Sequence, residues 1–122
     1  MKFHLQTPAA NVISGLGDDW IRIGVTEYRQ NLVVTPDRVV TDWAPAGFAA
    51  LTDADYAALL EYSPEVVLLG TGGQQRFPHP RLLHALTNAR VGVEVMDTRA
   101  ACRTFNILIA EDRRAVAALV VG

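Results

Sequence analysis

Apolar and polar residues alternate in short runs over the first part of the chain, residues 1–48. These runs are separated by Gly, Asp and Pro, a pattern that is typical of β-strands joined by turns. The strands that the pattern predicts are 3–6, 12–14, 20–25, 31–34 and 39–42. The segment Thr35-Pro-Asp-Arg38 predicts a hairpin turn, because proline presets φ for the second turn position and aspartate commonly follows it. Residues 1–48 are therefore expected to form a β-rich half.

A helical spacing of apolar residues follows. Thr52-Asp-Ala-Asp55 resembles a capping box, and an aromatic residue and leucines recur at helical spacing after it. This pattern predicts a helix over 53–62. Pro64 is expected to end that helix, because the ring of a proline disfavours helical geometry in the residue before it.

Residues 65–122 alternate between strand-like and helical patterns. Three apolar runs have the length and branching of buried strands: 65–69, 91–96 and 115–121. One helix is expected to begin near Pro80, and another at Asp97 or Thr98, whose side chains can cap it. This half therefore reads β-α-β-α-β, which predicts parallel pairing with right-handed crossovers and an α/β fold.

The composition indicates a single soluble domain over residues 1–122. The chain is 50% hydrophobic and 20% charged, as is usual for one globular domain of this length. No apolar run approaches the ~18 residues that suggest a membrane span, and the N-terminus resembles neither a signal peptide nor a transit segment. Cys102 is the single cysteine, which excludes an intrachain disulfide and a thiol-rich metal site. We therefore expect a cytoplasmic protein that does not insert into membranes.

The formal net charge of -2 conceals an asymmetry along the chain. Residues 1–65 carry four basic and nine acidic residues (net -5), whereas residues 66–122 carry seven arginines and four acidic residues (net +3). Such a split either orients a partner or an anion, or is an ordinary solvated face. A pI of 5.8 and the lack of an aromatic-plus-basic signature argue against nucleic-acid binding.

The most informative stretch is a glycine cluster that directly follows the apolar run 65–69. Gly70, Thr71, Gly72 and Gly73 can bring backbone amides close to a ligand. The cluster lacks the third glycine of a dinucleotide fingerprint and the Gly-Lys-Ser/Thr of a Walker loop, which favours a tight structural turn. A third interpretation is that exposed amides of Gly72 and Gly73, with Arg76 nearby, hold a small anion or an acidic side chain of a peptide.

A polar ridge is expected on the helix that follows Asp97, where Arg99, Arg103 and Asn106 recur at helical spacing. The ridge is either a solvent face or the border of a polar groove beside the glycine cluster. Cys102 lies between the two arginines, which lower a thiol pKa and would favour a reactive thiolate. Cysteine is also among the most buried residue types, and we favour a core thiol.

Histidines and serines show no catalytic or metal-binding spacing. His79 and His84 are five residues apart and would not share a helix face. Neither Ser14 nor Ser63 lies in a Gly-x-Ser-x-Gly context. The sequence therefore predicts no catalytic residue, no metal site and no cofactor.

The block from Asp97 to Arg114, within the longer segment 93–119, is the most specific part of the sequence. Together with Leu69-Gly-Thr-Gly72 and the proline-rich helix start that follows, it resembles a small family once labelled only as a domain of unknown function. That family includes mitochondrial complex I assembly factor 3 and an adipogenesis-associated protein. The resemblance covers nearly the whole chain.

The resemblance implies a compact α/β fold with a mixed central sheet, flanking helices and an additional N-terminal β layer. It implies no established catalytic activity, since the best understood members bind other proteins during assembly of the respiratory NADH dehydrogenase. The first residues do not resemble the transit segment of the mitochondrial members, so we expect a bacterial protein.

We therefore expect a non-enzymatic protein-interaction module. Its partner would be another protein, such as a respiratory-complex subunit or assembly component, and self-association stays open. The alternative is an enzyme or sensor that binds a small molecule or anion at residues 70–76. The expected binding groove comprises Gly70, Thr71, Gly72, Gly73, Arg76, Asp97, Arg99, Cys102, Arg103 and Asn106.

Overall fold

A computed structural model describes residues 9–122, which contain two β-sheets. The smaller sheet is antiparallel and consists of β1 (Ile13–Leu16), β2 (Ile21–Ile23) and β3 (Thr26–Tyr28). The larger, central sheet has the strand order β5-β4-β8-β6-β7. Its strands are β4 (Leu32–Val34), β5 (Val39–Val40), β6 (Val66–Thr71), β7 (Gly92–Met96) and β8 (Ala115–Val120).

The central sheet is mixed. Strand β6 pairs in parallel with both β7 and β8, whereas β4 pairs antiparallel with β8 and with β5. The predicted turn joins β4 to β5, and Thr35 donates its backbone N–H to the carbonyl of Arg38 over 2.9 Å. These features confirm the predicted α/β fold with a mixed central sheet and an additional N-terminal β layer. The predicted strand at 3–6 lies outside the described residues.

Two strand and helix predictions need correction. The alternation pattern missed β3, whose Thr26 and Glu27 are both exposed and give no apolar signal. The helix predicted over 53–62 is α-helical only over α1 (Asp53–Ala57) and tightens to the 3-10 helix η3 (Ala58–Tyr62). It ends as predicted before the proline, at Ser63, which adopts a left-handed conformation with φ 53°. The capping box is present: Asp55 donates its backbone N–H to the Thr52 hydroxyl.

The remaining helices begin where the sequence pattern predicts. The helix near Pro80 opens as the 3-10 helix η4 (Pro80–Leu83) and continues as α2 (His84–Asn88). Asp97 caps α3 (Thr98–Ala110) by accepting the backbone N–H of Ala100 over 2.8 Å. A short 3-10 helix, η2 (Phe48–Ala50), precedes α1.

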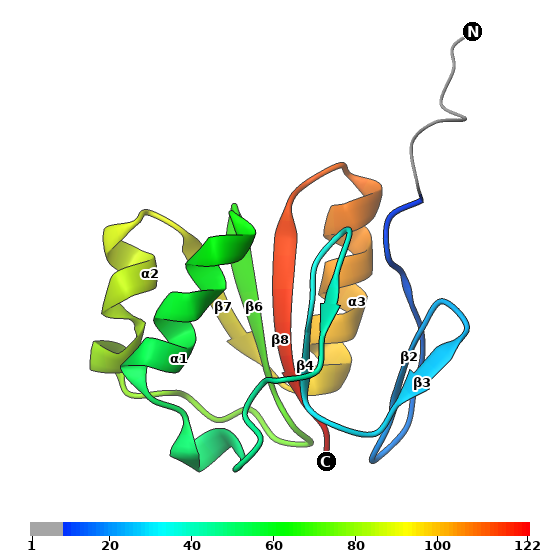
Figure 1. Cartoon of the computed structure of the whole chain (residues 1–122), viewed down its shortest axis with the longest axis horizontal. Helices are drawn as coiled ribbons and strands as arrows, with labels where there is room; N and C mark the ends of the chain where they lie inside the picture. The colour runs from blue at the N-terminus through cyan, green and yellow to red at the C-terminus, as the bar shows by residue number, and fades with distance from the viewer. Residues whose placement is uncertain (1–8) are drawn as a thin grey trace, which may run out of the picture.

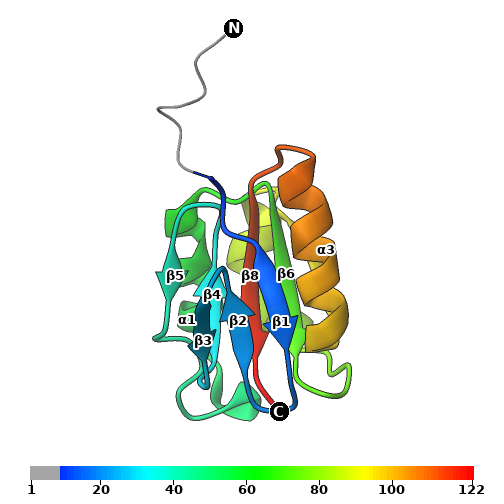
Figure 2. The same cartoon turned by 90° about the vertical axis from the view of Figure 1, so that its right-hand side faces the viewer.

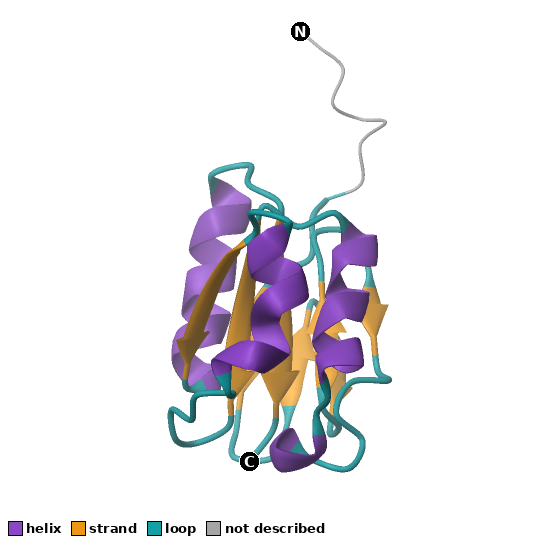
Figure 3. Cartoon of the chain, turned by 90° about the vertical axis from the view of Figure 1, so that its left-hand side faces the viewer, coloured by secondary structure: helices purple, strands orange, loops and turns teal. Residues whose placement is uncertain are grey.

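The elements stack in three layers around the central sheet. Helices α1 and α2 cover one face, and α3 and the small sheet cover the other (Figure 1). Figure 3 shows the short helices in front of the central strands, seen from their own side. The small sheet and α3 lie side by side on the opposite face, with β1 nearest to α3 and β3 farthest from it (Figure 2).

The period-two alternation of β6 divides the core between these two faces. Val67 and Leu69 pack in the cluster under α1 and α2, which also contains Tyr56, Leu59 and Leu86. Val66 and Leu68 pack in the cluster under α3 and the small sheet, which also contains Phe105, Ala101 and Ile21. Because α3 and β1 share this second cluster, the core fixes their relative position.

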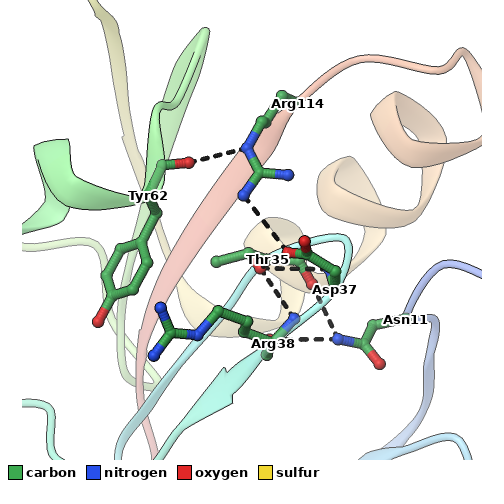
Figure 4. A network of polar contacts seen from close by, with 6 residues as sticks. All are labelled: Asn11, Thr35, Asp37, Arg38, Tyr62 and Arg114. Atoms are coloured by element: carbon green, nitrogen blue, oxygen red, sulfur yellow. Dashed lines mark hydrogen bonds and ion pairs between the residues drawn. The ribbon is translucent and has the colours of Figure 1, made fainter.

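A polar network closes the end of the central sheet at which β6 and β8 begin (Figure 4). Arg114 donates Nε–H to the carbonyl of Tyr62 over 2.8 Å and pairs with the Asp37 carboxylate at 3.3 Å. The Thr35 hydroxyl donates to the same carboxylate, and Asn11 donates to the Thr35 carbonyl. The hydrogen bond from Thr35, followed by the charge of Arg114, lowers the pKa of Asp37 below its ordinary value.

Candidate functional site

The opposite end of the central sheet, at which β6 and β8 finish, is held by one threonine. The Thr98 hydroxyl accepts the backbone N–H of Gly72 over 2.8 Å and donates to the carbonyl of Val120 over 2.6 Å. Thr98 also donates its backbone N–H to the Gly72 carbonyl over 2.9 Å. Thr98 is only 5% exposed, so these bonds form a fixed floor between the start of α3 and the ends of two strands. The expectation of a free amide at Gly72 is therefore wrong.

A hollow of about 490 Å³ opens above this floor, a volume within the range of small-molecule sites. It lies at the carboxyl ends of parallel strands, where α/β sheets commonly bind ligands. Its walls come from the β1–β2 turn, the glycine cluster, the start of α3 and the end of β8. The lining residues are Leu16, Gly17, Asp18, Gly72, Gly73, Asp97, Thr98, Arg99, Val121 and Gly122.

A second hollow, of about 240 Å³, continues from the first between β1 and α3. Its lining residues are Ile13, Ser14, Gly15, Leu16, Arg99, Cys102, Arg103 and Asn106. Leu16 and Arg99 line both hollows, so the two adjoin. We call the two together the β1–α3 groove.

The far end of the β1–α3 groove is fixed by Asn106. Its side-chain carbonyl accepts the backbone N–H of Ile13 over 2.9 Å, and its side-chain N–H donates to the Ile13 carbonyl over 2.8 Å. Asn106 thus ties α3 to β1, in addition to lying on the expected polar ridge. This leaves the two arginines of the ridge as the side chains that give the groove its positive charge.

Arg99 and Arg103 are both exposed. Within residues 9–122, neither guanidinium forms an ion pair; the ion pairs there involve other arginines. The smaller hollow contains both arginines and no carboxylate, whereas the larger one contains Arg99 together with Asp18 and Asp97. The groove therefore carries positive charge at one end and mixed charge at the other.

Cys102 faces the smaller hollow but is only 5% exposed. Burial raises the pKa of its thiol to about 12, and the opposing charges of Arg99 and Arg103 do not offset this effect. The thiol is therefore protonated at neutral pH, and the prediction of a core thiol is confirmed.

Three residues of the expected groove line neither hollow: Gly70, Thr71 and Arg76. Gly70 packs against α3, and an added Cβ would lie 3.1 Å from the Thr98 Cα. The Arg76 guanidinium donates to the Thr71 carbonyl over 2.7 Å and lies 4.5 Å from the centre of the Phe48 ring. These residues shape the loop after β6.

Conversely, the sequence pattern does not identify residues 13–18 as part of the site, because no local spacing links β1 to a helix more than eighty residues later.

Among residues 9–122, no group of three or more His, Cys, Asp or Glu side chains is arranged to hold a metal ion. Within the same residues, no helix has the length and apolar character needed to cross a membrane.

Comparison with known proteins shows relatives in both animals and bacteria. The model of a family described as "Protein of unknown function (DUF498/DUF598)" matches residues 13–120. The chain is 37% identical over 90 residues to NADH dehydrogenase [ubiquinone] 1 alpha subcomplex assembly factor 3 of Mus musculus, covering 72% of this chain and 48% of that protein. The chain thus spans about half the length of the curated relatives that it matches.

Bacterial relatives include a protein of Francisella tularensis named "13 kDa major membrane protein", which is 34% identical over 55 residues, 45% of each chain. Among solved structures, a Bordetella parapertussis protein superimposes with a TM-score of 0.85 at 36% identity, covering 95% of this chain and 99% of that one. The fold is therefore shared along almost the whole chain.

Proposed function

We propose that this chain, which belongs to the DUF498/DUF598 family of proteins of unknown function, is a non-enzymatic protein-binding module that uses the β1–α3 groove. The observation that carries the proposal is the pair of exposed arginines, Arg99 and Arg103, along the wall of a preformed groove. Arginine is enriched at protein interfaces because its planar fork of donors matches carboxylates and carbonyls.

The finer form of the proposal is a cytoplasmic factor that assists assembly of a respiratory complex. Its support is the sequence similarity to proteins named as NADH dehydrogenase assembly factors. A binding role also agrees with the thiol of Cys102, which is buried and protonated and so lacks the character of a nucleophile.

Affinity capture from a lysate of the encoding organism tests the proposed function. The test variant carries both Arg99→Glu and Arg103→Glu, and the matched control is Arg81→Glu, an exposed arginine in η4 on the other side of the central sheet. We expect the wild-type chain and the control to recover a defined protein that the double variant loses. Equal recovery by all three chains would refute the use of the groove.

A second function is favoured by the larger hollow alone. Its volume of about 490 Å³ suits a small molecule or anion, which would make the chain a ligand sensor or an enzyme. A thermal-shift screen of nucleotides, phosphates and carboxylates tests this candidate, because a ligand at ~100 times its dissociation constant stabilises by about 2.7 kcal/mol. No shift across the panel would remove it.

A further inference from the structure

The outer edge of β1 already pairs with an amide group. Ile13 both donates its backbone N–H to Asn106 and accepts an N–H from it, at 2.9 and 2.8 Å. Two reciprocal bonds of this kind are what a residue of an antiparallel strand exchanges with its neighbour. At this one position, Asn106 occupies the place of an adjacent strand.

At Leu16, the backbone N–H and C=O again point away from β2, toward the outer edge of β1. Gly17 donates its backbone N–H to the Trp20 carbonyl over 3.0 Å, which makes Gly17 a bonded position of the β1–β2 ladder. Successive residues of an antiparallel ladder alternate between bonded and outward-facing, so Leu16, opposite Ile21, directs its N–H and C=O away from β2. The register shift between Ile13 and Gly15 explains why Ile13 and Leu16 both face outward although they are three residues apart.

The outward-facing backbone groups of Leu16 form an open strand edge inside the groove. Among residues 9–122, no backbone bond outside the β1–β2 ladder involves Leu16. Its side of β1 faces α3, and Leu16 lines both hollows. A chain lying in the groove would therefore pass along this edge.

We propose that an extended segment of the partner protein adds to the outer edge of β1, pairing its main chain with Leu16 and placing an acidic side chain against Arg99 and Arg103. This inference rests on the proposed function and names the way in which the partner is recognised. In strand addition, main-chain hydrogen bonds provide affinity and side chains provide specificity.

The charges along the groove set the polarity of this segment. Arg99 and Arg103 stand at the smaller hollow without a carboxylate, whereas Asp18 and Asp97 line the larger hollow. An acidic side chain is therefore favoured at the first end over the second, where Arg99 lies beside two carboxylates. The segment is therefore acidic at one end and uncharged or basic at the other.

Panning a display library of random heptapeptides against the full chain tests the inference, because the library imposes no chemistry of its own. We expect enriched sequences with Asp or Glu at one end. A synthetic copy of the most enriched peptide should bind the Arg99→Glu, Arg103→Glu double variant about tenfold more weakly than wild type. The Arg81→Glu control should bind it as wild type does.

Two substitutions at Leu16 separate main-chain pairing from side-chain contact. Leu16→Pro removes the outward N–H without removing a bond of the β1–β2 ladder, whereas Leu16→Ala keeps the N–H and shortens the side chain. We expect peptide binding to fall more in the proline variant, with thermal unfolding confirming that both variants fold. Methylating the peptide nitrogens one at a time tests the same pairing without changing the protein. Binding should fall most at the one peptide residue whose N–H bonds to the Leu16 carbonyl.

Three outcomes would overturn strand addition at β1: no enriched peptide, enriched peptides without an acidic residue, or binding insensitive to N-methylation at every position. In each case, capture of a protein that the double arginine variant loses would still support the proposed function. Failure of both the capture and the peptide experiments would refute both proposals.

Discussion

The two ends of the central sheet use polar residues in opposite ways. At the end where β6 and β8 begin, Arg114 bonds to the Tyr62 carbonyl and to Asp37, and its backbone N–H bonds to Glu65. At the other end, Arg99 and Arg103 extend over a groove and form no ion pair within residues 9–122. Arginines therefore stabilise the fold at one end, whereas at the other end they form no ion pair among residues 9–122, as the proposed binding role requires.

This difference separates stability from recognition. Substitutions at the closed end should lower the free energy of unfolding and leave binding unchanged. Substitutions of the groove arginines should do the reverse, because most surface changes of this kind alter stability by less than about 0.5 kcal/mol. Thr98, in the floor beneath the groove, is an exception: its substitution should lower the free energy of unfolding, since Thr98 is buried and its hydroxyl bonds to both Gly72 and Val120.

Thr98→Val should produce the largest loss of stability among these changes. Valine fills the same space but leaves the Gly72 N–H and the Val120 carbonyl without the hydroxyl that now bonds them. Leaving such buried groups unpaired costs about 2 to 4 kcal/mol in total. Urea unfolding measures the loss, and Thr98→Ser, which keeps the hydroxyl, is the control. Equal stability of the two variants would show that the floor is not held by this hydroxyl.

Arg114→Leu should lower the free energy of unfolding by about 1 to 2 kcal/mol, because it removes the bond to Tyr62 and the ion pair with Asp37. The adjacent Arg113→Leu is a matched control, since among residues 9–122 the Arg113 side chain makes one polar contact, an exposed one of 3.9 Å with Glu65. Partner capture should be unchanged in both variants. If Arg114→Leu kept its full stability but lost the partner, the claim that this end of the sheet serves stability and not binding would be contradicted.

Acid should weaken the closed end through Asp37. The pKa of Asp37 is lowered in the folded chain, first by the hydrogen bond from Thr35 and then by Arg114, so the folded state binds a proton less readily than the unfolded state. The contribution of this carboxylate is complete above its ordinary pKa of 3.8 and disappears as the pH falls through the lowered value. Asp37→Asn should therefore show a shallower loss of stability in acid than wild type, measured by urea unfolding across that range. Parallel curves would contradict the role of Asp37.

The sequence predicted most elements because their signals are local. The hairpin turn after Thr35, the Asp97 cap and the apolar runs of β6 and β8 each depend on neighbouring residues. The sequence does not predict strand β3, because two of its three residues are exposed and polar. The segment is a strand because it pairs antiparallel with β2, not because of an apolar pattern of its own.

The site was predicted only in part, because its walls come from distant segments. Arg99, Arg103 and Asn106 were identified from helical spacing, but their opposite wall, β1, is brought to them by the shared core. The position of Arg76 in the sequence predicts a groove residue, yet its guanidinium bonds to the Thr71 carbonyl and lies over the Phe48 ring, and Arg76 lines neither hollow. Side-chain direction in a long loop is set by tertiary contacts that spacing does not encode.

Site-specific photo-crosslinking tests the central claim most directly. A photoreactive amino acid would replace Ile107, which is 58% exposed on α3 one turn after Arg103, and in a second chain Arg81, on the far side of the sheet. The account predicts a crosslinked partner protein from position 107 and none from position 81, with the product at 107 lost when Arg99→Glu and Arg103→Glu are added. A product at 81 alone, or one at 107 that persists in the double variant, would contradict it.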